Sequence, residues 1–163
     1  MLALLGERKS YMNGNPSIIR FLLTRLVIYL AAVLVTYLLA SIIATQSVVS
    51  SLAGMGVAVG LSDRMIMTSQ DIVGMASMFL PMVAFALLIA FLVAALICRW
   101  VKQWQLPLYV LAGAVAVICI HVALNLAFDL TPVAAARTNA GLLLQGLAGA
   151  VGGFTYISLT RKT

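Results

Sequence analysis

Charged residues are scarce in this sequence, and their scarcity excludes most soluble folds. Only 9% of the 163 residues are Asp, Glu, Lys or Arg, and 4 of these are acids. Soluble domains average about 25% charged residues. The chain therefore lacks the polar surface of a water-soluble domain. It also lacks the cluster of carboxylates that metal-assisted hydrolysis or general acid–base catalysis requires.

Cysteine and histidine are equally sparse. The two cysteines, Cys98 and Cys119, form no CxxC pair, which excludes a disulfide framework and a zinc-binding spacing. The only histidine, His121, cannot supply the usual pair of haem ligands. No HExxH, GxSxG or P-loop motif is present. We therefore predict that the protein is not an enzyme and holds no cofactor.

What the sequence does have is apolar length. Hydrophobic residues make up 64% of the chain and the mean hydropathy is +1.14, values that predict an integral membrane protein. Apolar runs of about 20 residues span a bilayer as helices. We predict an all-α, polytopic single domain over residues 1–163, a bundle of four transmembrane helices. The predicted spans are 18–44, 70–97, 106–128 and 133–159.

Residues that favour helix starts set these boundaries. Ser17 can cap the first span, whose apolar stretch is longer than that of a signal peptide, so we expect an uncleaved helix. Thr68 and Asp71 have the spacing of a capping box before the second span. Pro107 and Pro132 suit the first turns of the third and fourth spans.

The outer connection, 45–69, is too apolar for a solvated loop and too short to span. We predict a short helix in it, lying on the membrane surface or folded back onto the bundle and ending near Gly60. Its apolar stripe consists of Val48, Leu52, Met55 and Val59.

Positive charges predict the orientation. Eight Lys and Arg residues fall on one side of the four spans and only Arg64 and Arg137 on the other, which predicts that both termini are cytoplasmic, in a bacterial inner (plasma) membrane. No basic patch is interleaved with aromatics, so we expect no nucleic-acid partner. We expect contact with membrane lipids, including anionic headgroups, through Arg20, Arg25, Arg99, Lys102, Arg161 and Lys162.

A glycine-rich stretch, 139–154, is the strongest packing signal. Five of the 12 glycines fall between Gly141 and Gly153. In a transmembrane helix, small residues mark the face that another helix approaches closely. The predicted packing residues are Gly141, Gly146, Gly149 and Gly153, with Gln145 on the same face. We expect the third span to pack there, through Gly113, Val117, His121 and Asn125.

Ionisable residues inside a membrane are candidates for function. His121, Asn125 and Asp129 are four residues apart and share a helix face, and Gln145 lies on the expected partner helix. These side chains are interpreted either as a polar track for a proton, a cation or a polar headgroup, or as hydrogen bonds that hold the helices together.

Methionine is the other candidate ligand, because thioether sulfur suits Cu(I). Met78/Met82 and Gly149/Gly153 resemble MxxxM and GxxxG patterns of copper uptake proteins of the Ctr family, but here they lie in separated helices and four spans replace three. Packing by flexible apolar side chains is the other interpretation. The residues concerned are Met65, Met67, Met75, Met78 and Met82.

Two functions follow from these patterns. The first is a small non-enzymatic membrane subunit or accessory protein that associates with another membrane protein, or with itself as a homo-oligomer, through small-residue helix faces. The alternative is an oligomeric channel or transporter for a small cation, a metal ion or a lipid, using the polar track.

Overall fold

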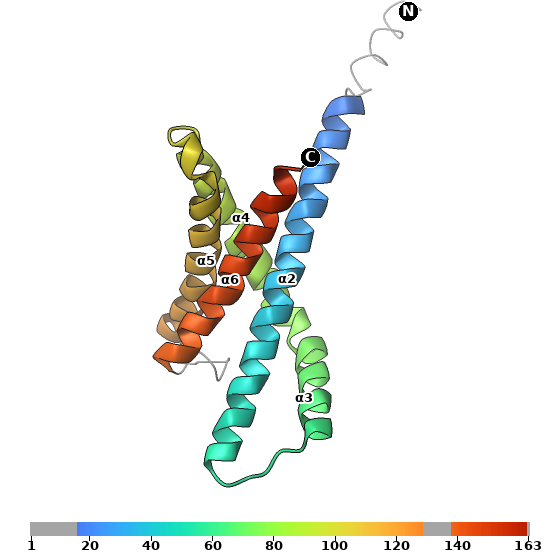
Figure 1. Ribbon diagram of the computed structural model, residues 1–163, viewed down its shortest axis with the longest axis vertical. Coiled ribbons are helices and arrows are strands. Elements are labelled where there is room, and N and C mark those ends of the chain that lie inside the picture. The colour runs from blue at the N-terminus through green and yellow to red at the C-terminus, as the bar shows by residue number, and fades with distance from the viewer. Residues whose placement is uncertain (1–15, 129–137, 163) are drawn as a thin grey trace, which may run out of the picture.

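The computed structural model describes residues 16–128 and 138–162, and this part of the chain is all-α, as predicted (Figure 1). Four helices are long and apolar enough to cross a membrane, and one short helix lies between the first two, so the chain is an integral membrane protein. The elements are α2 (Pro16–Gly54), α3 (Leu61–Gly74), α4 (Ala76–Cys98), the 3₁₀ turn η1 (Lys102–Trp104), α5 (Gln105–Phe128) and α6 (Asn139–Thr160).

Helix α2 is longer than the predicted first span. The prediction ended it at residue 44, but the helix continues to Gly54. Within this hydroxyl-rich stretch the side chains satisfy their donors on carbonyls one turn earlier: Ser47 donates to Ile43 at 2.8 Å and Ser51 to Ser47 at 2.9 Å. The chain then turns at Gly56, whose φ of +83° is accessible to glycine without strain.

The short helix α3 follows Gly60, whereas the prediction placed it before that residue. It runs back along α2 (Figure 1), and Thr45 on α2 donates a hydrogen bond of 2.7 Å to the carboxylate of Asp71. The predicted capping box is wrong, because Thr68 lies inside α3 and bonds to the Arg64 carbonyl. The second span accordingly begins at Ala76 rather than at residue 70.

Helix α6 lies between α5 and α2, while α4 packs against α5 and α2 (Figure 1). The start of α6 is capped by Thr138, whose hydroxyl accepts a hydrogen bond of 3.1 Å from the Gly141 N–H. The start predicted at residue 133 lies outside the described residues. Helix α4 buries one face at nearly four-residue spacing, composed of Phe79, Val83, Leu87, Phe91, Ala94 and Cys98.

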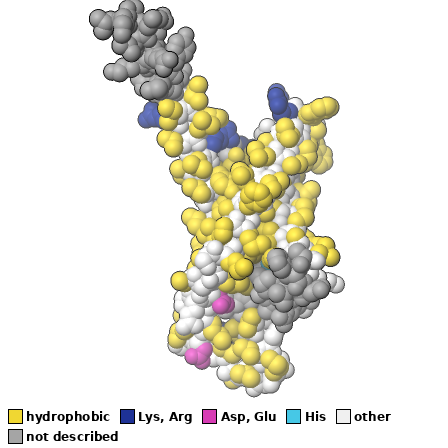
Figure 2. All heavy atoms as spheres, turned by 180° about the vertical axis from the view of Figure 1, so that it is seen from behind, with side chains coloured by type: hydrophobic (Ala, Val, Ile, Leu, Met, Phe, Trp, Pro, Cys, Tyr) yellow, Lys and Arg dark blue, Asp and Glu magenta, His cyan; other side chains and the backbone are white. Residues whose placement is uncertain are grey.

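The charges of the described residues are divided between the two ends of the bundle (Figure 2). Asp63 and Asp71 both lie on α3, at the end opposite the start of α2. The predicted lipid-contact residues lie near the start of α2, at the α4–α5 turn and at the end of α6; they are Arg20, Arg25, Arg99, Lys102, Arg161 and Lys162. We call this end of the molecule the cationic end.

Candidate functional site

The glycine-rich face of α6 packs against the backbone of α5. A Cβ atom at Gly149 would overlap the Gly113 carbonyl oxygen and lie 2.8 Å from Val117 Cγ2. A Cβ atom at Gly153 would overlap the Tyr109 carbonyl oxygen. The two helices therefore touch through their main chains, a closeness that only glycine allows.

The neighbouring side of α6 packs against α2 in the same way. A Cβ atom at Gly152 would overlap Thr36 Oγ1 and lie 3.2 Å from the Ala32 carbonyl oxygen. Gly141 and Gly146 are also buried. The structure thus places all four predicted packing glycines inside the chain, where α6 meets its own neighbours. This face is not open to another protein.

A cluster of buried polar side chains lies among these helices. Gln145 is 0% exposed and donates from Nε2 to the Ala40 carbonyl at 3.0 Å, and His121 is 4% exposed. The imidazole lies beside the Gln145 side chain, and its ring centroid is 5.8 Å from that of Phe79. Among the described residues, neither His121 nitrogen nor the Gln145 carbonyl oxygen has a partner in hydrogen-bonding geometry.

The remainder of the predicted polar track does not join this cluster. Asn125, one turn from His121, is exposed, because the helix face on which His121 is buried turns outward there. Asp129 lies outside the described residues. Three hydroxyl side chains on α2 are also buried, those of Thr36, Ser41 and Thr45. The alignment of the first two on the first span indicates interhelical hydrogen bonds or a lined pathway, whereas Thr45 was not predicted.

A cavity leads toward this cluster from the ends of α2 and α6. This cavity of about 420 Å³ between α2 and α6 has polar walls that include Gln46, Ser47 and Thr138, and it reaches Gly141, one turn before Gln145. On the other side of His121, aromatic rings fill the core between the helices. Phe91 and Tyr156 stack with centroids 4.6 Å apart. The described residues therefore form no continuous polar path through the bundle.

The methionines do not share one environment. Met65 and Met78 are 68% and 76% exposed, while Met75 and Met82 pack against the hydrophobic core. Met67 is half-buried on α3. The packing interpretation accounts for the inner two, and the exposed pair projects away from the core.

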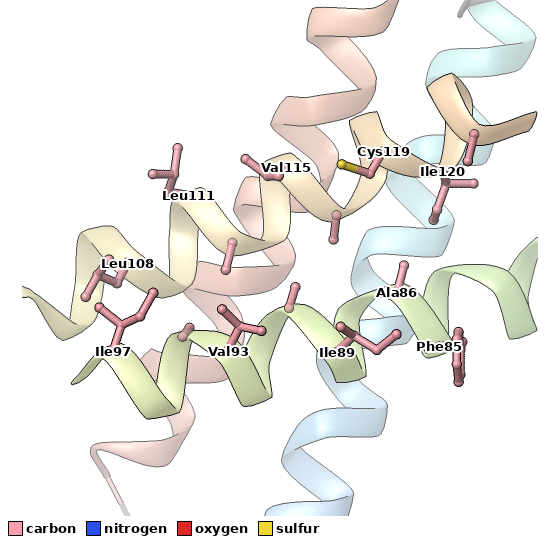
Figure 3. A pocket seen from close by; sticks show the side chains of 15 residues that line it. Phe85, Ala86, Ile89, Val93, Ile97, Leu108, Leu111, Val115, Cys119 and Ile120 are labelled. Atoms are coloured by element: carbon pink, nitrogen blue, oxygen red, sulfur yellow. The ribbon is translucent and has the colours of Figure 1, made fainter. Parts of the chain in front are cut away.

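An apolar groove of about 540 Å³ lies between α4 and α5, and we call it the α4–α5 groove (Figure 3). Small residues recur at four-residue spacing on both of its walls. They are Ala86, Ala90 and Ala94 on α4, and Ala112 and Ala116 on α5.

Larger side chains border these alanines, including Ile89, Val93, Leu111 and Val115, which Figure 3 shows on the two facing helices. Cys119 lies in the groove and is exposed, whereas Cys98 is buried. The sequence analysis missed this groove, although the alanine spacing on α4 was a signal that could have indicated it.

Comparisons of the chain with models of protein families, with curated proteins and with solved structures found no match. Function is therefore argued from the residues and surfaces described above.

Proposed function

We propose that this protein is a small non-enzymatic membrane subunit or accessory protein that binds a transmembrane helix of another membrane protein in the α4–α5 groove. The observation that supports the proposal is an apolar groove whose floor is made of small alanines and whose rims carry exposed side chains such as Ile89, Val93 and Leu111. Helices associate in lipid mainly by close van der Waals packing, and small residues permit that approach. The glycine faces, by contrast, are already occupied within the chain.

The dimensions of the groove suit a helix. Its lining on α4 runs from Phe85 to Ile97, which is about 18 Å at 1.5 Å per residue. Three helical turns of a partner would therefore lie against it. Because the walls are almost entirely apolar, the partner face needs no charged group.

The exposed thiol of Cys119 allows a direct test in native membranes. With Cys98 replaced by Ala, a membrane-permeant crosslinker that carries a maleimide and a photoreactive diazirine should react with Cys119 through the maleimide. On illumination the diazirine loses N₂ and its carbene inserts into a C–H bond of the partner, which gives a new, heavier band. Ala90→Phe, which fills the groove, should abolish this band. Leu147→Phe is the matched control, because Leu147 is 60% exposed on α6 and lies outside the groove.

The identity of the band decides between occupants. A heteromeric product supports the proposal, and a product of twice the chain mass identifies a second copy as the partner. If no product forms, or if Ala90→Phe leaves it unchanged, the groove holds only lipid and the proposal fails.

We further propose that the cationic end faces the cytoplasm of a bacterial cell, with the chain in the inner (plasma) membrane. The support is the excess of Lys and Arg at that end. Impermeant thiol reagents should label an Arg161→Cys variant only after the cells are opened, and should label Ser69→Cys in intact spheroplasts. The reverse pattern would invert the orientation.

A channel or transporter for a small cation is the second candidate. One observation favours it: His121 and Gln145 keep unpartnered polar atoms in the interior of the described bundle, and such atoms commonly bind water or an ion. In reconstituted vesicles, His121→Leu should then abolish proton or cation flux, while Asn125→Leu, on the exposed face, should retain it. Equal flux in both variants would remove this candidate.

A further inference from the structure

A further, smaller cavity lies at the cationic end and shares no lining residue with the α4–α5 groove. Its volume is about 320 Å³, near the lower end of the range for small-molecule pockets. Segments from α2, the α4–α5 turn and α6 surround it. The residues that define this basic pocket are Arg25, Arg99, Lys102, Gln105, Tyr109 and Thr160.

Three of these residues are cations, and they come from three separate elements: Arg25 from α2, Arg99 from the cap of α4 and Lys102 from η1. The two acids among the described residues, Asp63 and Asp71, both lie on α3 at the opposite end of the molecule. In the part of the chain that the structure describes, no carboxylate pairs with the three cations. The Arg25 guanidinium lies 5.0 Å from the centroid of the Phe21 ring, and no acid of the described residues offsets the charge of the three cations, so an anion in the pocket would be attracted by all three.

We propose that the basic pocket binds a phosphoryl group, and that an anionic phospholipid headgroup carries it. Two guanidinium groups and one ammonium group supply the forked and single donors that recognise phosphate oxygens. Gln105 adds a neutral amide donor to the wall. This site goes beyond the proposed accessory function, because it uses a different surface and a different ligand.

The surroundings of the pocket favour a lipid as the source of the phosphoryl group. It lies at the ends of the spanning helices, which is the depth of the headgroups. Beside it, Trp100 and Trp104 are 90% and 57% exposed at the α4–α5 turn, and tryptophan prefers the headgroup region. Its remaining walls are apolar, with Ala95, Cys98 and Ile157 available to the glycerol and the first acyl carbons.

Native mass spectrometry of the full chain in neutral detergent tests this proposal. The ligands are phosphatidylglycerol, phosphatidylcholine and inorganic phosphate. We expect phosphatidylglycerol to bind at least about tenfold more tightly than phosphatidylcholine, a difference of about 1.4 kcal/mol. The variant R25Q/R99Q/K102Q should lose this preference. The charge-matched comparison R20Q/R161Q/K162Q removes the same charge from headgroup-contact residues outside the pocket, and it should lose much less of the preference than the pocket variant does.

Each result has a defined meaning. Equal losses in the two triple variants, or equal binding of both lipids, would overturn the pocket and leave only a diffuse basic surface. Binding of inorganic phosphate without any preference for phosphatidylglycerol would support a phosphoryl site but overturn the lipid as its source. If the pocket variant fails to fold, Lys102→Gln, at an exposed position, is compared with Arg64→Gln on α3, at the opposite end of the molecule. The preference should weaken in the first only, and equal weakening counts against the pocket.

Discussion

Replacing Gly149 with Ala tests whether the main-chain contact between α5 and α6 holds the bundle together. The new methyl carbon would overlap the Gly113 carbonyl oxygen and lie 2.8 Å from Val117 Cγ2. Two carbons pack best at about 3.5–4.0 Å, so the helices must separate by roughly 1 Å. Overpacking of this kind costs about 1–3 kcal/mol, and the backbone obstacle cannot rotate away.

The control is Gly74→Ala, because a Cβ atom there meets nothing within 4 Å. Alanine favours a helix over glycine by about 1 kcal/mol, so this control should be neutral or slightly stabilising. Because both variants carry the same helical gain, the gain cancels between them, and we expect Gly149→Ala to be less stable than Gly74→Ala by about 2 kcal/mol. The measurement is unfolding by SDS in mixed micelles, followed by circular dichroism.

A double variant sharpens the result. Gly113→Ala meets the same contact from the other helix, where a Cβ atom would lie 3.0 Å from the Gly149 carbonyl carbon. Once one substitution has separated the helices, the second should cost less, so the double variant should lose less stability than the sum of the two. The reasoning is refuted if Gly149→Ala is as stable as Gly74→Ala.

Three further substitutions test other contacts. Thr45→Val removes the hydrogen bond to Asp71 and should loosen α3 by about 1 kcal/mol, seen as faster amide exchange in α3 with α5 and α6 unchanged. Gly56→Ala places alanine at φ +83° and should lower the free energy of unfolding by about 1–2 kcal/mol, whereas Gly54→Ala, also free of contacts, should not. Gln145→Met removes the hydrogen bond to the Ala40 carbonyl and should lower the free energy of unfolding by only about 0.6 kcal/mol, because interhelical hydrogen bonds in membranes are weak. A decrease of more than about 2 kcal/mol would show that the polar cluster stabilises the fold.

Much of the fold was predictable because the bilayer removes alternatives. An apolar run of span length must be helical, since unpaired backbone groups are too costly in lipid. The third span, predicted over 106–128, forms as Gln105–Phe128 for that reason. The end of α2 was not predictable in the same way, because the helix continues past the last residue of the apolar run. In that extension the hydroxyl groups of Ser47 and Ser51 donate hydrogen bonds to carbonyls of the same helix.

The candidate sites were predictable only where spacing implies contact. Glycines four residues apart lie on one face of a helix and let the backbone of another helix come close. Their spacing therefore predicted the packing face of α6 from the sequence. Alanines are common in any membrane helix, so their spacing on α4 does not by itself predict a groove. The groove can be recognised only when the position of α5 beside α4 is known. Arg25 is likewise about 74 positions from Arg99 in the sequence, and only the packing of α2 against the other helices brings the two into one pocket.

The position of α6 has a consequence for the order of assembly. Helix α6 follows α2 and α5 in the chain, yet it lies between them and contacts the backbone of both. During synthesis, α2 and α5 must therefore wait in the membrane with Thr36 and Gly113 facing lipid or an insertion factor until α6 arrives. Insertion of this helix completes the bundle, so a released chain truncated before residue 139 should leave the α6-facing sides of α2 and α5 uncovered, with α4 as the contact between them.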